Sequence, residues 1–230
     1  MIMTTIADQL QQVRARIVKA CAAAGRDAAG VQLLAVSKTF GPEAVRQAHA
    51  AGQFAFGENY VQEALDKIAA LADLRTDLQW HCIGPLQSNK TRVVAEHFDW
   101  VHSVDRLKIA QRLSAQRPPN LPPLQLCLQI NVDGGANKSG VAPAEALALA
   151  REVAALPQVR LRGLMAIPEP ADGFEAQRAL FEDVARLYEQ LRAEGLALDT
   201  LSLGMSADLE AAVAAGSTMV RVGTAIFGRR

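Results

Sequence analysis

This sequence lacks an excess of charge of either sign, because 24 basic side chains balance 24 acidic ones. Proteins that bind nucleic acid or an anionic membrane by electrostatic attraction usually carry a basic patch or stripe. The longest apolar runs are also far shorter than the roughly 20 residues that a transmembrane helix needs. We therefore expect neither nucleic acid nor a membrane among the partners of this protein.

Cysteine is scarce as well: Cys21, Cys82 and Cys127 are far apart and odd in number, and no CxxC or CxxH spacing suggests a metal. Each lies in an apolar context, which favours reduced thiols packed as small hydrophobic side chains. The first ten residues show no charged segment before an apolar stretch, so we expect no signal peptide. These features together predict a soluble cytoplasmic protein.

Half of the 230 residues are hydrophobic, and they form short apolar runs that alternate with helical patterns. The eight runs predict strands at residues 31–37, 53–57, 79–83, 100–104, 124–131, 161–166, 200–204 and 219–222. Helical patterns are found, for example, at residues 43–50, 61–71, 106–114, 143–156, 174–194 and 208–215. Such alternation is typical of α/β proteins with parallel strands and crossover helices.

Eight such units in a chain of this length favour a single (β/α)8 TIM barrel that spans residues 1–230. Residues 4–24 predict an extra N-terminal amphipathic helix, with Ile6, Leu10 and Val13 on one face. An open doubly wound sheet is the alternative, but no GxGxxG follows the first predicted strand. No interdomain linker is apparent, because the proline-rich segment 117–123 is too short to separate domains.

Lys38 directly follows the first predicted strand, and Thr39-Phe40-Gly41-Pro42 then breaks that run. A lysine at the mouth of a buried strand is expected to lose solvation, which favours its neutral amine. A neutral amine can attack an aldehyde and form a Schiff base. The alternative is that Lys38 extends its ammonium into solvent past the end of the strand.

Two further loops suggest a phosphate site, because TIM barrels often bind phosphate at the loops after strands seven and eight. Ser206 follows the seventh predicted strand, with a helix expected from about Ala207, and Gly223 and Thr224 follow the eighth. Hydroxyls beside glycines at helix N-termini bind anions through free N–H groups and the helix dipole. Ser206 alone would fit an ordinary N-cap, and Gly-Thr turns are common, but their joint position favours phosphate.

Arg221 lies near the end of the eighth predicted strand, and arginine is rarely buried without a planar acceptor. Its partner is either a ligand or a carboxylate inside the barrel, such as Glu58. Asn59 ends the second strand, where it either caps the next helix or contacts a ligand. His81 and His102 fit packed core histidines better than catalytic groups.

The chain shows no Ser–His–Asp order, no HExxH motif and no clear pair of carboxylates at adjacent strand ends. A strand-end lysine, a two-loop phosphate site and an arginine suit an aldehyde that carries a phosphate. Pyridoxal 5'-phosphate (PLP) fits this description, and Arg221 would be a partner for its ring nitrogen.

Six segments also resemble the motifs of one family, and they follow one another along nearly the whole chain. They are Ala35-Val-Ser-Lys-Thr39, Phe56-Gly-Glu-Asn-Tyr-Val-Gln-Glu63, Trp80-His-Cys-Ile-Gly-Pro-Leu-Gln-Ser-Asn-Lys90, Leu161-Arg-Gly-Leu-Met-Ala-Ile-Pro168, Leu203-Gly-Met-Ser206 and Gly216-Ser-Thr-Met-Val-Arg-Val-Gly-Thr-Ala-Ile-Phe-Gly228. The chain thereby resembles the pyridoxal phosphate homeostasis proteins of the YggS/PROSC type.

This resemblance implies a barrel of the alanine racemase N-terminal type in which Lys38 holds PLP as an internal aldimine. It further implies that Ser206, Gly223 and Thr224 hold the phosphate, that Arg221 faces the pyridine nitrogen and that Asn59 lines the ring. An arginine at the pyridine nitrogen disfavours its protonation and weakens the ring as an electron sink. The family is accordingly regarded as a carrier or regulator of PLP without established catalytic turnover.

The alternative reading is a PLP-dependent racemase-like or aldolase-type enzyme. Alanine racemases take a catalytic tyrosine from an additional C-terminal domain, whereas this chain stops at Arg230 and contains only Tyr60 and Tyr188. A third reading is a module that delivers PLP to apo PLP-dependent enzymes. We expect a monomer, because no coiled coil or obvious edge device demands a dimer.

The sequence departs from this family at Phe40, where many relatives carry a second lysine. Any secondary binding role of that lysine is therefore in doubt here. Lys138, in the glycine-rich segment 131–140, is a candidate to replace it, and the alternative is that Lys138 is an ordinary solvated cation.

Overall fold

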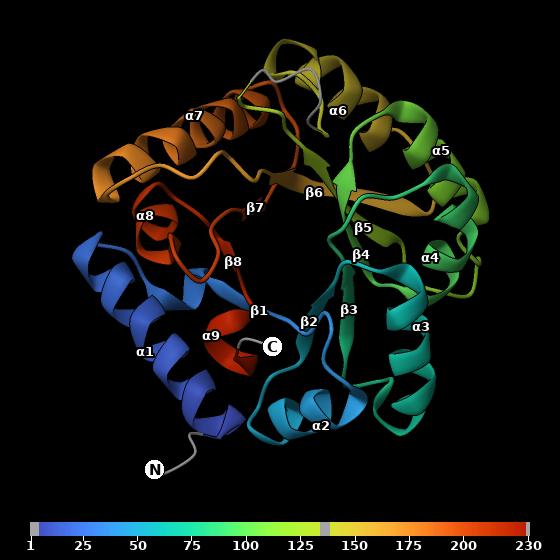
Figure 1. The fold of residues 1–230 in the computed structure, drawn as a ribbon. Coiled ribbons are helices and arrows are strands. Elements are labelled where there is room, and N and C mark those ends of the chain that lie inside the picture. Colours follow the sequence, from blue (N-terminus) through green and yellow to red (C-terminus); the bar gives the residue numbers. More distant parts are fainter. Residues whose placement is uncertain (1–4, 134–138, 229–230) are drawn as a thin grey trace.

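The computed structural model describes residues 5–133 and 139–228, and within them eight parallel strands close into a barrel (Figure 1). Each strand pairs with the next along the chain, and the last pairs with the first. The strands are β1 (Gln32–Val36), β2 (Ala55–Glu58), β3 (Gln79–Cys82), β4 (Trp100–Val104), β5 (Leu124–Gln129), β6 (Val159–Met165), β7 (Thr200–Ser202) and β8 (Met219–Val222). The predicted TIM barrel is confirmed.

Helices cover the outside of the barrel, as the ring of coiled ribbons in Figure 1 shows. They are α1 (Ile6–Ala23), α2 (Pro42–Ala50), α3 (Val61–Ala70), α4 (Thr91–His97), α5 (Leu107–Gln116), α6 (Ala146–Ala154), α7 (Phe174–Ala193), α8 (Leu209–Ala214) and α9 (Thr224–Phe227). α4 and α9 lie outside the helices predicted from the sequence. α9 has only four residues, which are too few to show a helical period, and α4 has seven.

The extra N-terminal helix α1 is present and lies beside α8 and α9 (Figure 1). Thr5 begins it with a capping box, in which its hydroxyl accepts from the Asp8 backbone while the Asp8 carboxylate accepts from the Thr5 backbone. Its buried face carries Leu10, Val13 and Ile17. α1 therefore contacts the two helices that follow the last two strands of the barrel.

Side chains alternate between the inside and the outside of the barrel along each strand. Leu34, Ala55 and Met219 form a small cluster separate from the large core, whereas Leu33 belongs to the large core that includes the helices. We therefore assign Leu34 to the inner face of β1. This alternation decides which strand-end residues meet above the barrel interior.

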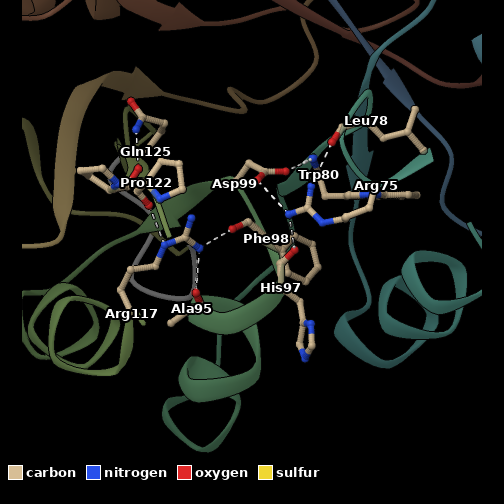
Figure 2. Close-up of polar contacts among 11 residues, drawn as sticks. Arg75, Leu78, Trp80, Ala95, His97, Phe98, Asp99, Arg117, Pro122 and Gln125 are labelled. Carbon is tan, nitrogen blue, oxygen red and sulfur yellow. Dashed lines mark hydrogen bonds and ion pairs between the residues drawn. The ribbon is translucent and has the colours of Figure 1, made fainter. Parts of the chain in front are cut away.

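Two arginines form hydrogen bonds between neighbouring segments at the end of the barrel where β3, β4 and β5 begin, as Figure 2 shows. Arg117 donates to the carbonyls of Ala95 and Phe98, each at 2.7 Å. Arg75 donates to a carboxylate oxygen of Asp99 at 2.9 Å. In TIM barrels the binding site lies at the opposite, carboxyl end of the strands.

None of the helices in the described ranges combines the length and apolar character that crossing a bilayer requires.

Candidate functional site

A cavity of about 560 Å³ opens at the carboxyl ends of the strands, within the size range of small-molecule sites. All six residues of the site predicted from the sequence line it, namely Lys38, Asn59, Ser206, Arg221, Gly223 and Thr224. The sequence separates them by up to 186 positions (224 − 38), and the barrel closure brings β1 beside β8. Their role in holding a ligand stays a prediction.

Lys38 follows β1 with the same alternation as Leu34 and Val36, and it lines the cavity. Its side chain is exposed. The expectation that the strand end removes Lys38 from solvent is therefore wrong for the protein on its own. The ammonium makes no hydrogen bond or ion pair with any residue that the structure describes, so its amine is available to a ligand.

Asn59 lies between β2 and α3, and its side-chain oxygen Oδ1 is buried without a hydrogen-bond partner. The alternative that Asn59 caps α3 is wrong, because the N-cap is Tyr60 and no side chain caps that helix. Gly84 lets the chain after β3 approach closely, since a Cβ there would lie 2.2 Å from the Asn59 carbonyl oxygen. An unsatisfied buried acceptor beside a cavity favours a polar ligand.

Arg221 is 4% exposed and reaches the cavity from β8. Its Nη1 donates to the Ser202 carbonyl (2.6 Å) and hydroxyl (2.8 Å), and Nη2 donates to the Ala166 carbonyl (3.0 Å). Burial lowers the pKa of Arg221 to about 10, so the guanidinium is still a cation at neutral pH. No carboxylate pairs with it among the described residues.

The alternative that Arg221 pairs with Glu58 inside the barrel is wrong. Glu58 instead accepts a hydrogen bond from Lys67 at 2.7 Å. The reason is the alternation of β2: Ala55 belongs to the inner cluster, so Glu58, three residues later, points outward toward α3. A buried cation without an anionic partner favours a ligand that presents an acceptor.

A buried hydrogen-bonded chain continues from Arg221 into the barrel. The Ser202 hydroxyl lies 3.1 Å from His102 Nδ1, and His102 Nε2 lies 3.0 Å from His81 Nδ1. Burial lowers the pKa of His81 to about 3 and that of His102 well below its usual value, so both rings are neutral. Both are core residues, as expected, although His81 Nε2 has no partner.

The loops after β7 and β8 line the same cavity as Lys38. Ser206 does not cap a helix, because α8 begins at Leu209 with Asp208 as its N-cap, two residues later than predicted. Its hydroxyl has no partner among the described residues. Gly223 is the N-cap of α9 and Thr224 its first residue, and the first N–H groups of a helix lack intrahelical partners. This side of the cavity therefore offers hydroxyl and backbone donors suited to an anion.

Gly223 also lies close to β1, because a Cβ there would be 3.1 Å from the Val36 carbonyl oxygen. The close approach favours a residue without a side chain and places the loop after β8 beside the strand that Lys38 follows.

Sequence reasoning missed the apolar walls of the cavity, formed by Val36, Phe40, Ile83, Ile167 and Met205. The inward parity of Val36 was the available signal. The rings of Phe40 and Phe227 lie 5.3 Å apart, so Phe40 packs on α9 where many relatives carry a lysine. Lys138 lies outside the described residues.

Comparisons with known proteins show which family this chain resembles. Residues 9–230 match the model of the family described as alanine racemase, N-terminal domain. The pyridoxal phosphate homeostasis protein of Pseudomonas aeruginosa is 64% identical over 228 residues, which cover 99% of this chain and 97% of that protein. The protein of the same name from Escherichia coli K12 is 54% identical over 229 residues, with 99% and 98% covered.

Solved structures of other proteins also resemble this chain. PipY of Synechococcus elongatus PCC7942, solved with PLP bound, is 42% identical with a TM-score of 0.85, covering 97% of this chain and all of that one. The alanine racemase of Corynebacterium glutamicum has a TM-score of 0.67 over 96% of this chain and 62% of that one. Its identity of 20% makes it a relative in fold alone.

Proposed function

Because the chain belongs to the family of pyridoxal phosphate homeostasis proteins, with the fold of the alanine racemase N-terminal domain, we propose that it binds PLP in PLP homeostasis. The binding site is the cavity at the carboxyl ends of the strands. One observation carries the proposal: a partner-free lysine, a buried cation without a carboxylate and two donor-rich loops line the same cavity. In this proposal residues 1–230 form one PLP-binding domain.

The residues of the cavity fit this cofactor. PLP supplies, when bound, an aldehyde carbon with which a neutral lysine amine forms a Schiff base. Lys38 provides that amine once its ammonium has released a proton. Asn59 brings an amide whose buried oxygen has no partner among the residues that the structure describes, and we assign it to the edge of the ring.

We assign the phosphate of the cofactor to the loops after β7 and β8. Ser206 and Thr224 donate from their hydroxyls, and the first turn of α9 donates from its backbone. Gly223 leaves the backbone accessible because it has no side chain. These groups line the same cavity as Lys38, so a ligand that bears both an aldehyde and a phosphate is held by Lys38 and by these groups.

Arg221 sets the electrostatics at the pyridine nitrogen. Its guanidinium is held by Ser202 and Ala166, which use three of its five N–H groups. A cation at that place disfavours protonation of the nitrogen and thereby weakens the ring as an electron sink.

We further propose that the protein holds and releases PLP without catalytic turnover. Racemisation needs an acid/base group on each face of the substrate, and the described lining of the cavity contains no histidine, tyrosine or carboxylate. The racemase-like alternative predicts that the protein exchanges the α-proton of an amino acid in deuterated water. Proton exchange at a rate far above that of free PLP would favour the enzyme.

Delivery to apo PLP-dependent enzymes, a monomeric state and a cytoplasmic location are further parts of the proposal. Delivery is tested by mixing loaded protein with an apo-enzyme. Transfer faster than the spontaneous release of PLP supports delivery, and transfer at the release rate supports storage alone.

Titration with PLP, followed by visible absorption, tests the binding proposal. The wild type and the Lys108→Ala control, which removes an exposed lysine of α5, should both develop a Schiff-base band. Lys38→Ala should develop none. A band of unchanged intensity in Lys38→Ala would contradict the proposal.

A further inference from the structure

The segment that carries Lys38 is held from α3 by a buried ammonium. Lys67 is 3% exposed although it lies on a helix. Its Nζ donates to the Ser37 carbonyl, to Glu58 Oε1 and to Glu63 Oε1, each at 2.7 Å. An ammonium has three N–H donors, so this arrangement uses all of them.

The bonds of this group reach both neighbours of Lys38. Before it, the Ser37 carbonyl accepts from Lys67, and the Ser37 hydroxyl donates to Glu58 Oε1 at 2.6 Å. After it, the Thr39 backbone N–H donates to Glu63 Oε1 at 2.5 Å. Lys38 itself takes no part. We call Lys67, Glu58 and Glu63 the α3 clamp.

The backbone at Thr39 needs such support. Its φ of +68° lies in the left-handed region, which a β-branched residue rarely adopts. The bond from its N–H to Glu63 holds this conformation. If the bond is lost, Thr39 can return to an ordinary conformation, and the direction of the preceding Lys38 side chain changes with it.

We propose that the α3 clamp is a positioning device that directs Lys38 toward the cavity, with Lys67 as its centre and Glu63 as the group that fixes Thr39. The inference rests on the proposed function for its consequence, which is efficient capture of the PLP aldehyde. Its structural part, the fixed backbone at Thr39, can be observed without any cofactor.

The first measurement compares PLP binding of Glu63→Ala with that of Glu63→Gln. Glu63 is partly exposed, with 29% of its side chain accessible, so both variants should fold. Alanine removes the acceptor of the Thr39 N–H and should weaken Schiff-base formation about tenfold, as expected for one charge-assisted hydrogen bond. Glutamine keeps an acceptor oxygen and should restore most of the binding.

Asp66→Ala is the matched control, because it removes an exposed carboxylate from the same helix. Unchanged binding in Asp66→Ala, together with loss in Glu63→Ala and recovery in Glu63→Gln, supports the positioning role. Equal loss in the alanine and glutamine variants would mean that charge alone matters and would overturn it.

The second measurement is hydrogen exchange of the Thr39 amide in the protein without PLP. The clamp predicts slow exchange in the wild type and in Glu63→Gln, and fast exchange in Glu63→Ala. Fast exchange in the wild type would overturn the clamp even if PLP binds. Failure of the wild type to form any Schiff base would instead refute the proposed function, and the exchange pattern would still decide whether Thr39 is fixed.

Discussion

The lysine side of the cavity is held by buried charged side chains, whereas the loops of the phosphate side are held by backbone hydrogen bonds and by partly exposed side chains such as Asp208, which accepts from the Met205 N–H. On the lysine side, Lys67 and Glu58 are 3% and 1% exposed. On the phosphate side, the Arg221 N–H donates to the Gly204 carbonyl, and the Leu203 N–H donates to the Met219 carbonyl. The ion pair nearest to that side, Arg16–Glu210, has side chains that are 35% and 44% exposed.

The difference follows from what each side has to fix. The lysine side must aim one long, flexible side chain, and it does so through the strained conformation of Thr39. The phosphate side needs only a concave set of donors, which helix starts and glycines supply from the backbone. Substitutions should therefore act strongly and specifically on the lysine side and weakly on the phosphate side.

The largest effect is expected for Lys67→Met. Removing one partner of a buried ion pair leaves an uncompensated charge, here on Glu58, and typically costs about 3–5 kcal/mol of stability. Urea unfolding at neutral pH measures the change. Lys108→Met is the exposed control, and a loss below about 1 kcal/mol in Lys67→Met would show that the lysine side is no more rigidly built than the surface.

Additional loss of the Glu58 charge should reverse part of this effect. In Lys67→Met/Glu58→Gln the buried charge is gone, so the double variant should be more stable than Lys67→Met alone. A double variant that is less stable than both single variants would contradict the electrostatic explanation.

The next effect is acid destabilisation through the histidines below Arg221. Burial lowers the folded-state pKa of His81 to about 3 and that of His102 well below 6.5, so the unfolded chain binds more protons. The contribution of these neutral histidines to the free energy of unfolding is therefore fully present above pH 6.5. It is lost progressively as the pH falls toward 3. For His81 the loss should be roughly 2 kcal/mol between pH 7 and pH 5, and His102 adds to it in the same direction.

Urea unfolding at pH 7 and pH 5 measures this loss. Glu58 acts in the opposite direction, because burial raises its pKa despite the opposing effect of Lys67. The comparison is therefore made with His81→Gln/His102→Gln, which keeps Glu58. An equal pH dependence in the two proteins would refute the role of the buried imidazoles.

A smaller and selective effect is expected for Ser206→Ala/Thr224→Val. Losing two hydroxyl donors should weaken PLP binding by about tenfold and leave binding of pyridoxal, which has no phosphate, unchanged. Glu63→Ala should weaken the binding of both ligands. Titration of each variant with each ligand measures this difference between the two sides of the cavity. If Ser206→Ala/Thr224→Val weakened the binding of PLP and of pyridoxal equally, the proposed difference would be refuted.

The smallest effect is expected for Arg16→Ala. Arg16 Nη2 donates to the Ser206 carbonyl at 3.0 Å, and the same side chain pairs with Glu210. Partly exposed pairs of this kind contribute about 1 kcal/mol or less. Thermal unfolding and PLP titration should both change little, and a loss as large as that of Lys67→Met would show that α1 is essential to the phosphate side.

Much of the fold can be predicted from local sequence patterns. The eight apolar runs predict the eight strands because each buried parallel strand must be apolar on both faces. Lys38, Ser206 and Gly223 each follow one of these predicted strands. The carboxyl ends of all strands in a barrel lie at the same end, so these three residues are expected near one another. The four-residue helix α9 escapes prediction because it is too short to show a helical period.

The interactions between elements are less predictable. Lys67 appears in the sequence as an ordinary helix-surface charge four residues after Glu63, and only the tertiary structure shows that it is buried against β1 and β2. Glu58 looks like a partner for Arg221 until the alternation of β2 is considered. The exposure of Lys38 also depends on the curvature of the loop after β1, which no local pattern records.

Borohydride reduction of the PLP-treated protein, followed by peptide mass spectrometry, tests the central proposal most directly. The reduction makes a Schiff base permanent, so the modified lysine can be identified. We predict a single pyridoxyl phosphate adduct on the peptide that contains Lys38, at PLP concentrations that leave exposed Lys108 unmodified. An adduct spread over surface lysines, or none on Lys38, would contradict the account.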